Sequence, residues 1–290
     1  MANYTQHVLI LGHDAQSARV FIEELLDSTP QNDIRYTLIH PNAAQILLRL
    51  NGVDYVETSI GTQAFEDILK QGDGLMCLKP LETGILNKLR PLLETTGIKR
   101  AVFCTREGNY HPPAARAHQE IHYAIQDLIK SNLDWTLLRP TTICGGDDDP
   151  ILRLSKKLQK RRSKFLMVNR TISKHFLQPL HERDFAQAFL KSFTNANTFR
   201  QIYGLSGHKP QKVEKIVNHM CHKLGIRWMR IPFGLRDARL PRWVLLATKD
   251  RPLRLTRLGQ SIITPHEKAF RDFGFVPKVD LHLTESQTDD

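Results

Sequence analysis

The sequence predicts an α/β protein in which a doubly wound parallel sheet is followed by a smaller C-terminal region. Two observations carry this prediction. Short apolar runs alternate with helical stretches over the first 140 residues, and an apolar run at 7–11 enters a tight turn at Gly12 and then a helical pattern. Strands separated by helices of this length pair in parallel through right-handed crossovers, so a doubly wound sheet is the simplest arrangement.

Each strand is expected where large apolar residues cluster between turn residues. These clusters lie at 7–11, 36–40, 53–58, 74–78, 100–104 and 135–140. Helices are expected where apolar residues recur at helical spacing, at 15–27, 42–51, 61–71, 84–96 and 114–132. Pro91 is expected to break the fourth helix, because proline removes a backbone donor and clashes with the preceding turn.

The character of the chain changes after the strand that ends at Pro140. We expect residues 1–145 to form the sheet domain, with later segments returning to it, and residues 146–290 to form a smaller basic region. In the second part we expect a turn at 147–150, a basic helix at 151–164, a helix at 185–193, a strand at 202–206 and a helix at 212–224.

The turn after the first strand stands where a dinucleotide fold has its phosphate loop. A Rossmann-type fold places glycines there so that the chain bends sharply, the backbone approaches the pyrophosphate and the helix packs close to the strand. Gly12 is present, while Ala15 and Ala18 stand near the other two glycine positions. A methyl group keeps the packing but crowds a phosphate. Gly12, Ala15, Gln16 and Ser17 are the candidate phosphate-binding residues.

Composition bounds the class of protein. The 290 residues are 41% hydrophobic, which is enough for a sizeable core. No apolar run approaches the ~18 residues needed to span a bilayer, and the polar N-terminus is unlike a signal peptide, so we expect a cytoplasmic protein. The four cysteines have neither disulfide-framework nor metal-ligand spacing, so we expect buried thiols and no metal site.

The net charge of +11 is spread unevenly. Residues 1–150 hold 13 Lys and Arg against 19 Asp and Glu, whereas residues 151–290 hold 28 against 11. Between Ile151 and His181 there are nine Lys and Arg and no acidic residue. This charge favours an anionic small molecule, a nucleic acid or an acidic surface as partner. A solvated helix face is the alternative explanation.

Four tracts in the same order resemble the extended and atypical short-chain dehydrogenase/reductases, specifically the nucleotide-sugar epimerase/dehydratase branch. The first is the strand and loop around Gly12. The second, WTLLRPTTICG at 135–145, is similar to the family's strand ending in Arg-Pro and a following Tyr-Gly, with Cys144 in place of the tyrosine. The third, QPLHERDFA at 178–186, and the fourth, AFRDFGFVP at 269–277, are similar to two C-terminal segments of the family.

The resemblance implies an N-terminal domain that binds NAD or NADP and a smaller region that closes over a nucleotide-linked sugar. It places Arg139 and Pro140 beside the cofactor. An acid at the end of the second strand selects NAD and a nearby arginine selects NADP. His40 stands there instead, as a candidate ribose contact, and Arg19 is a candidate phosphate contact. The choice between NAD and NADP is therefore open.

The resemblance also implies a catalytic Ser or Thr, a Tyr and a Lys. Thr105 falls near the Ser/Thr position, with the capping of a strand end as the alternative role. The Tyr-x-x-x-Lys pair is lost, because Pro112 and Arg116 occupy its two positions. Arg116 keeps a positive charge but is not a tunable amine. Tyr110 is a candidate replacement for the missing tyrosine, as are His111 and His118, with a place in a loop or on a helix surface as the alternative for all three.

The sequence therefore predicts an NAD(P)-binding protein related to epimerases, dehydratases or reductases of a nucleotide-linked sugar. The alternative is a catalytically inactive member that acts as a cofactor sensor, an assembly factor or a nucleic-acid-binding protein. A homodimer is compatible with either.

Overall fold

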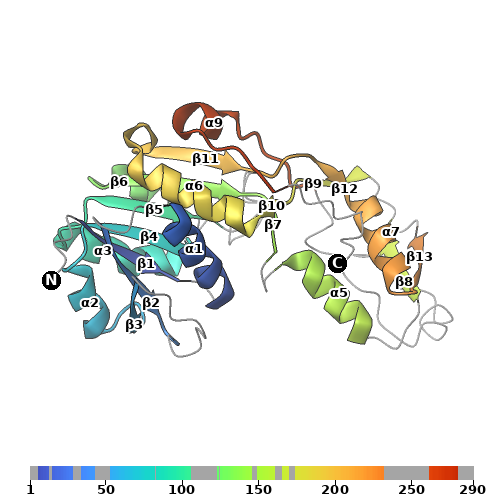
Figure 1. The fold of residues 1–290 in the computed structure, drawn as a ribbon, viewed down its shortest axis with the longest axis horizontal. Helices are drawn as coiled ribbons and strands as arrows, with labels where there is room; N and C mark the ends of the chain where they lie inside the picture. Colours follow the sequence, from blue (N-terminus) through green and yellow to red (C-terminus); the bar gives the residue numbers. More distant parts are fainter. Residues whose placement is uncertain are drawn as a thin grey trace.

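In the computed structural model a large sheet domain lies at one end of the molecule and a smaller lobe at the other (Figure 1). The structure describes residues 6–12, 15–28, 34–42, 53–81, 83–105, 123, 125–145, 149–160, 165–169, 174–231 and 261–279. None of the helices in these ranges is long and apolar enough to cross a membrane.

The sheet has seven strands, all parallel, in the order β11-β6-β5-β4-β1-β2-β3. In chain order the strands are β1 (Gln6–Leu11), β2 (Ile34–His40), β3 (Val53–Glu57), β4 (Gly74–Pro80), β5 (Arg100–Cys104), β6 (Asp134–Pro140) and β11 (Gln201–Leu205). The chain runs from β1 outward to β3 on one side and then crosses to β4 on the other. The prediction of a doubly wound parallel sheet is confirmed.

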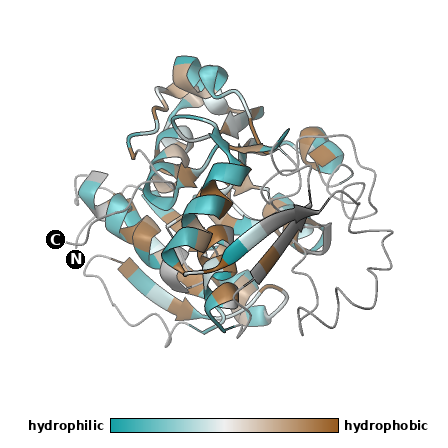
Figure 2. Ribbon diagram, turned by 90° about the vertical axis from the view of Figure 1, so that its right-hand side faces the viewer, coloured by the Kyte–Doolittle hydropathy of each residue, from teal (hydrophilic) through white to brown (hydrophobic). Residues whose placement is uncertain are grey.

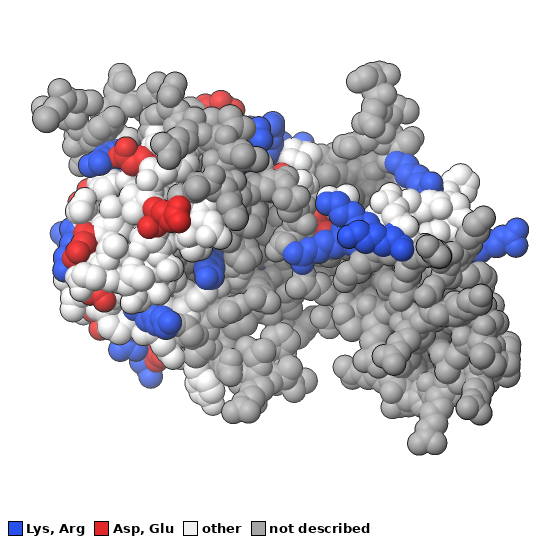
Figure 3. All heavy atoms as spheres, turned by 90° about the horizontal axis from the view of Figure 1, so that it is seen from below, with Lys and Arg blue, Asp and Glu red and all other residues white. Residues whose placement is uncertain are grey.

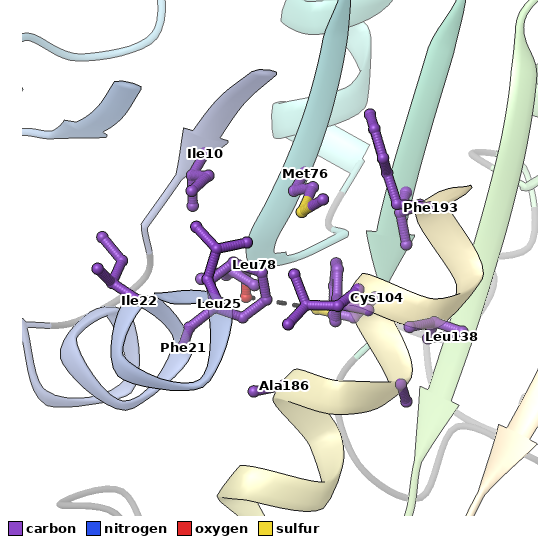
Figure 4. Packing of buried hydrophobic residues seen from close by; sticks show 14 of the residues in the cluster. Ile10, Phe21, Ile22, Leu25, Met76, Leu78, Cys104, Leu138, Ala186 and Phe193 are labelled. Atoms are coloured by element: carbon purple, nitrogen blue, oxygen red, sulfur yellow. Dashed lines mark hydrogen bonds between the residues drawn. The ribbon is translucent and has the colours of Figure 1, made fainter. Parts of the chain in front are cut away.

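Both faces of the sheet are covered by helices, which explains why its central strands are largely apolar. On one face α1 (Ala15–Ser28) and α6 (Glu182–Thr194) lie side by side (Figure 1). Their apolar side chains meet those of β1, β4, β5 and β6 in one core (Figure 4). The other face is covered by α2 (Gln63–Leu69), α3 (Thr83–Thr95) and helical residues 125–130.

Two later segments return to the sheet. Strand β11 pairs with β6, and α9 (Glu267–Phe273) packs against β11 through a T-shaped contact between Tyr203 and Phe273. The Tyr203 hydroxyl donates to the Asp272 carboxylate at 3.0 Å. The Asp184 carboxylate accepts hydrogen bonds from the backbone N–H groups of Lys278 and Val279, at 2.9 and 3.1 Å. Residues from the end of the chain thereby fasten the start of α6.

A buried cation fastens the other end of α6. Arg100 is 7% exposed, and its guanidinium donates to the carbonyl oxygens of Ser192 and Phe193 and to the hydroxyls of Thr136 and Thr198. Burial lowers the pKa of Arg100 to about 10. Because the last carbonyls of a helix carry partial negative charge, they accept this cation favourably.

The smaller lobe has an apolar cluster of its own, contributed mainly by α5 (Pro150–Lys160) and α7 (Val213–Lys223). Three short pairs accompany it, between β8 (Phe165–Asn169) and β13 (Arg227–Ile231), β9 (Phe176–Leu177) and β12 (Gln211–Lys212), and β7 (Ile143–Cys144) and β10 (Leu180–His181). Brown and teal residues alternate along the helices in Figure 2, the pattern of helices with one buried side.

The predicted strands and most predicted helices agree with the structure to within a few residues. One prediction is wrong, because α3 runs without interruption through Pro91. Leu86, Leu89 and Leu93 are all buried on the core side of α3, so tertiary packing outweighs the one lost backbone hydrogen bond. The helix predicted at 42–51, and most of the one at 114–132, lie outside the described residues.

Candidate functional site

The candidate site lies at the carboxyl edge of the sheet, where the strand order reverses between β1 and β4. In open α/β sheets the crevice outside this edge is the usual ligand position. The ends of β2, β1, β5 and β6 bring His40, Gly12, Thr105 and Pro140 to this one edge. With strands about 4.8 Å apart, Gly12 and Thr105 stand two strand spacings, roughly 10 Å, from each other.

Gly12 lies where a larger residue would fit tightly. Its N–H donates to the Ile39 carbonyl at 3.0 Å, which extends the pairing of β1 with β2 by one residue. A Cβ on Gly12 would lie 3.2 Å from Cδ2 of His40 and 3.5 Å from both Cβ of Ala18 and Cδ1 of Leu38. Ala18 is fully buried, so the small residue predicted there does let α1 approach the strand.

The first turn of α1 follows this loop. Ala15, Gln16 and Ser17 are its first three residues, and the first four N–H groups of any helix have no partner within the helix. No acidic residue stands in this first turn. An anionic group is therefore favoured at this helix end by the free donors and the helix dipole. A phosphate-binding role for the three residues stays a prediction.

His40 lies over the loop in one defined tautomer. The side chain is 6% exposed, and its Nδ1 accepts a hydrogen bond from the backbone N–H of Asn42 at 3.1 Å. A nitrogen that accepts carries no proton, so Nε2 bears the hydrogen of the neutral ring and is a donor. A coenzyme would thus meet a hydrogen-bond donor where NAD-selective folds present a carboxylate. Arg19, the other candidate, is paired with Glu23 at 2.7 Å.

Thr105 is the most distinctive residue of the edge. Its N–H continues the sheet by donating to the Leu138 carbonyl at 3.0 Å, and the residue is 2% exposed. The hydroxyl oxygen has no hydrogen-bond partner among the described residues. A threonine that caps a strand end would bond the backbone that follows it, and residues 106–122 lie outside the described residues, so the capping role stays an alternative. A buried hydroxyl without a partner costs free energy and is expected where a ligand supplies the partner.

Arg139 and Pro140 end β6 and pair with Gly204 and Leu205 of β11. Pro140 is buried and Arg139 half-buried. The next residue, Thr141, continues the pairing by donating its N–H to the Leu205 carbonyl at 2.8 Å. The Arg-Pro pair therefore belongs to the same edge as Gly12 and Thr105. Its contact with a cofactor stays a prediction.

The remaining catalytic candidates, Tyr110 and Arg116, lie outside the described residues, as does Pro112. Among described residues, no group of three or more His, Cys, Asp or Glu side chains is arranged to hold a metal ion. Asp149 caps the start of α5, because its carboxylate accepts hydrogen bonds from the backbone N–H groups of Ile151 and Leu152, at 2.7 and 3.2 Å.

The four cysteines are buried and free, as predicted. Burial raises the pKa of Cys77 to about 12, that of Cys221 to about 11, and that of Cys104 well above its ordinary value. Such thiols hold little thiolate at neutral pH and are poor nucleophiles.

His181 and Asp184 support the fold. Nδ1 of His181 accepts from the Arg183 N–H at 3.1 Å and caps α6. Burial lowers the pKa of His181. Its Nε2 lies 3.1 Å from the position that a Cβ on Gly145 would occupy.

Sequence reasoning missed Gln178 and the pair Ser206 and His266. The Gln178 side chain is 6% exposed and donates to the Gly207 carbonyl at 2.9 Å, and its Oε1 has no partner among the described residues. Ser206 follows β11, and its fully buried hydroxyl lies 2.7 Å from Nδ1 of His266. A polar residue directly after an apolar strand was the available signal in the case of Ser206.

No family model and no curated protein sequence matches the chain. Solved structures do match over nearly its whole length. An epimerase from the methanogen Methanothermobacter thermautotrophicus superposes with a TM-score of 0.71 at 9% identity, covering 98% of this chain and 90% of that one. The UDP-glucose 4-epimerase of Thermotoga maritima, solved with UDP-glucose, gives 0.69 at 13% identity, covering 96% of each chain.

A third match is the UDP-glucuronic acid 4-epimerase of Bacillus cereus, in complex with UDP-glucuronic acid and NAD. Its TM-score is 0.69 at 10% identity, with 96% of this chain and 95% of that chain covered. The chain thus has the fold of these epimerases, as the resemblance of the four sequence tracts predicted. At these identities the likeness defines the fold alone.

Proposed function

We propose that the protein binds an NAD or NADP dinucleotide across the carboxyl edge of the sheet and acts on a nucleotide-linked sugar. The observation that carries the proposal is the buried hydroxyl of Thr105, which has no partner among the described residues and stands on the same edge as the Gly12 loop. Epimerases of the same fold were solved with NAD and with UDP-sugars.

The described residues fit such a ligand in three respects. The start of α1, which follows Gly12 closely in the chain, offers backbone donors to a pyrophosphate. His40 offers a donor beside them. Thr105 offers a hydroxyl further along the edge, where it would hydrogen-bond a reacting or neighbouring oxygen. When bound, the dinucleotide would supply hydride transfer, and the chain's residues would position it.

Calorimetric titration of the purified protein with NAD, NADH, NADP and NADPH tests the first half of the proposal. We expect one of them to bind at micromolar strength with one site per chain. Incubation with that dinucleotide and a panel of UDP-sugars, followed by NMR of the sugar, tests the second half. Failure of all four dinucleotides to bind would contradict the proposal.

A second candidate is a non-catalytic protein that binds the dinucleotide without turnover. It is favoured by Pro112 and Arg116, which replace the Tyr-x-x-x-Lys pair of the family that the chain resembles. The same two experiments separate the candidates, because this one predicts dinucleotide binding with no change in any UDP-sugar.

A further inference from the structure

Gln178 lies at the junction between the sheet domain and the smaller lobe. Its neighbour Leu177 belongs to the apolar cluster of the lobe, and Leu180 belongs to the core shared by the sheet, α1 and α6. Strands β9 and β10, which flank Gln178 in the chain, lie between the sheet and the helices α5 and α7 (Figure 1). The segment 177–180 therefore joins the two apolar cores, and Gln178 stands where they meet.

Hydrogen bonds fix Gln178 to separate parts of the chain. Its backbone N–H donates to the Ile262 carbonyl at 3.1 Å, and its carbonyl accepts from the hydroxyl of Thr141, the residue after β6. The side-chain Nε2 donates to the Gly207 carbonyl at 2.9 Å. A carbonyl can only accept, so this bond identifies the nitrogen end of the side-chain amide. The Oε1 atom is thus held in place as an acceptor.

This acceptor has no hydrogen-bond partner among the described residues, although the Gln178 side chain is 6% exposed. An unpaired buried acceptor costs free energy and is expected where a ligand supplies the donor. The absence of a side chain on Gly207 allows the arrangement, because a Cβ there would lie 1.6 Å from the Pro179 carbonyl oxygen. The backbone at 178–179 therefore lies directly against the chain that follows β11.

The unpaired atoms of Gln178 and Thr105 belong to the same edge of the sheet. Thr105 follows β5, and Gly207, which binds the Gln178 side chain, follows β11. Strand β6 lies between β5 and β11, so these two strand ends are roughly 10 Å apart. Gly12, at the end of β1, lies on the other side of Thr105. Gln178 therefore stands at the end of the edge that is remote from the proposed pyrophosphate position.

The chemistry of Oε1 selects the part of a ligand that it can bind. Phosphate oxygens are acceptors, so a pyrophosphate gives this atom no hydrogen bond. The hydrogen-bond partners of Gln178 are neutral, whereas Lys and Arg side chains lie on the surface of the lobe (Figure 3). A hydroxyl of a sugar meets both conditions, because it is neutral and can donate.

We propose that Gln178 is a substrate-binding residue whose Oε1 accepts a hydrogen bond from a hydroxyl of the sugar ring. The inference rests on the proposed function, since it takes a nucleotide-linked sugar as the substrate. Oε1 is shielded from water in the ligand-free protein, so neighbouring side chains shift as the sugar enters. Loss of the acceptor would leave a buried sugar hydroxyl unpaired, which weakens binding.

The test is calorimetric titration with UDP, with the tighter-binding of UDP-glucose and UDP-glucuronic acid, and with the best-binding dinucleotide. Gln178→Met, which keeps the length of the side chain but not its amide, is compared with the wild type and with Gln187→Met. Gln187 is a matched control, because its amide already donates to Glu24 where α6 packs against α1. Thermal melting of all the proteins accompanies the titrations, and Gln178→Asn replaces the first variant should it melt early.

We expect Gln178→Met to bind the UDP-sugar at least ~tenfold more weakly than the wild type, with UDP and dinucleotide binding within about twofold and Gln187→Met close to wild type. Equal weakening of UDP, or weakening of the dinucleotide, would overturn the inference, because Gln178 would then contact another part of the ligands. Unchanged binding of all three ligands, or a UDP-sugar that binds the wild type no more tightly than UDP, would overturn it as well. These outcomes leave the dinucleotide site standing, whereas a wild type that binds neither dinucleotide nor UDP-sugar refutes the proposed function too.

Discussion

Replacing Thr105 by valine should stabilise the ligand-free protein. The side chain is 2% exposed and its hydroxyl has no partner among the described residues. An unsatisfied buried hydroxyl costs about 1–3 kcal/mol, and a methyl group of similar size removes that cost. We therefore expect Thr105→Val to raise the free energy of unfolding by about 1 kcal/mol, a melting shift of ~2–4 °C. Urea and thermal unfolding without ligand measure it.

The matched control is Thr136→Val in β6. The Thr136 hydroxyl is also buried, but it accepts from Arg100 at 2.8 Å and donates to the Thr198 carbonyl at 2.7 Å. Loss of this hydroxyl leaves the Arg100 guanidinium and the Thr198 carbonyl each without one hydrogen-bond partner, and should lower the free energy of unfolding by about 1–3 kcal/mol. The same substitution thus changes stability in opposite directions at two positions of one sheet. Destabilisation by Thr105→Val comparable to that of Thr136→Val would refute the reasoning.

Three further predictions concern the supports of the site. Arg100→Met should lower the free energy of unfolding, measured in urea, by at least ~3 kcal/mol, because several carbonyl oxygens lose their hydrogen-bond donor. Unchanged stability would contradict the role of Arg100 in fastening the end of α6. Gly207→Ala should cost at least ~2 kcal/mol, since its Cβ would collide with the Pro179 carbonyl oxygen, and a near-wild-type urea midpoint would contradict this. His181→Asn should reduce the loss of protein stability that occurs as the pH falls below neutral. The lowered pKa of His181 means that its contribution is full above pH ~6.5 and is lost as the pH falls through the folded-state pKa. Asparagine keeps the cap without titrating, so melting curves at pH 7 and 5 should differ less than in the wild type; an unchanged difference would contradict the assignment.

Periodicity was sufficient to predict the sheet, because its central strands are buried on both faces and read as continuous apolar runs. It failed at Pro91, since the breaking tendency of proline is local and the packing of α3 against the sheet is not. A strand at 202–206 and the return of later segments to the sheet were expected, but the pairing of β11 with β6 is a long-range contact that periodicity alone does not define.

The candidate site was only partly predictable. Gly12 could be placed from the strand that precedes it, and Thr105 from the resemblance to the family. The lack of a partner for the Thr105 hydroxyl among the described residues depends on how several strand ends are arranged, which no local pattern encodes. The role of Arg100 was equally hidden, because its partners in β6, at the end of α6 and at Thr198 lie 34 to 98 residues away in the chain.

Hydrogen exchange with and without the best-binding dinucleotide tests the central claim most directly. The account predicts added protection at the carboxyl edge, in the peptides that contain Gly12, His40 and Thr105, and little change in α5 or α7. Protection confined to the smaller lobe, or no protection with any of the four dinucleotides, would contradict the claim that the ligand lies across the edge of the sheet.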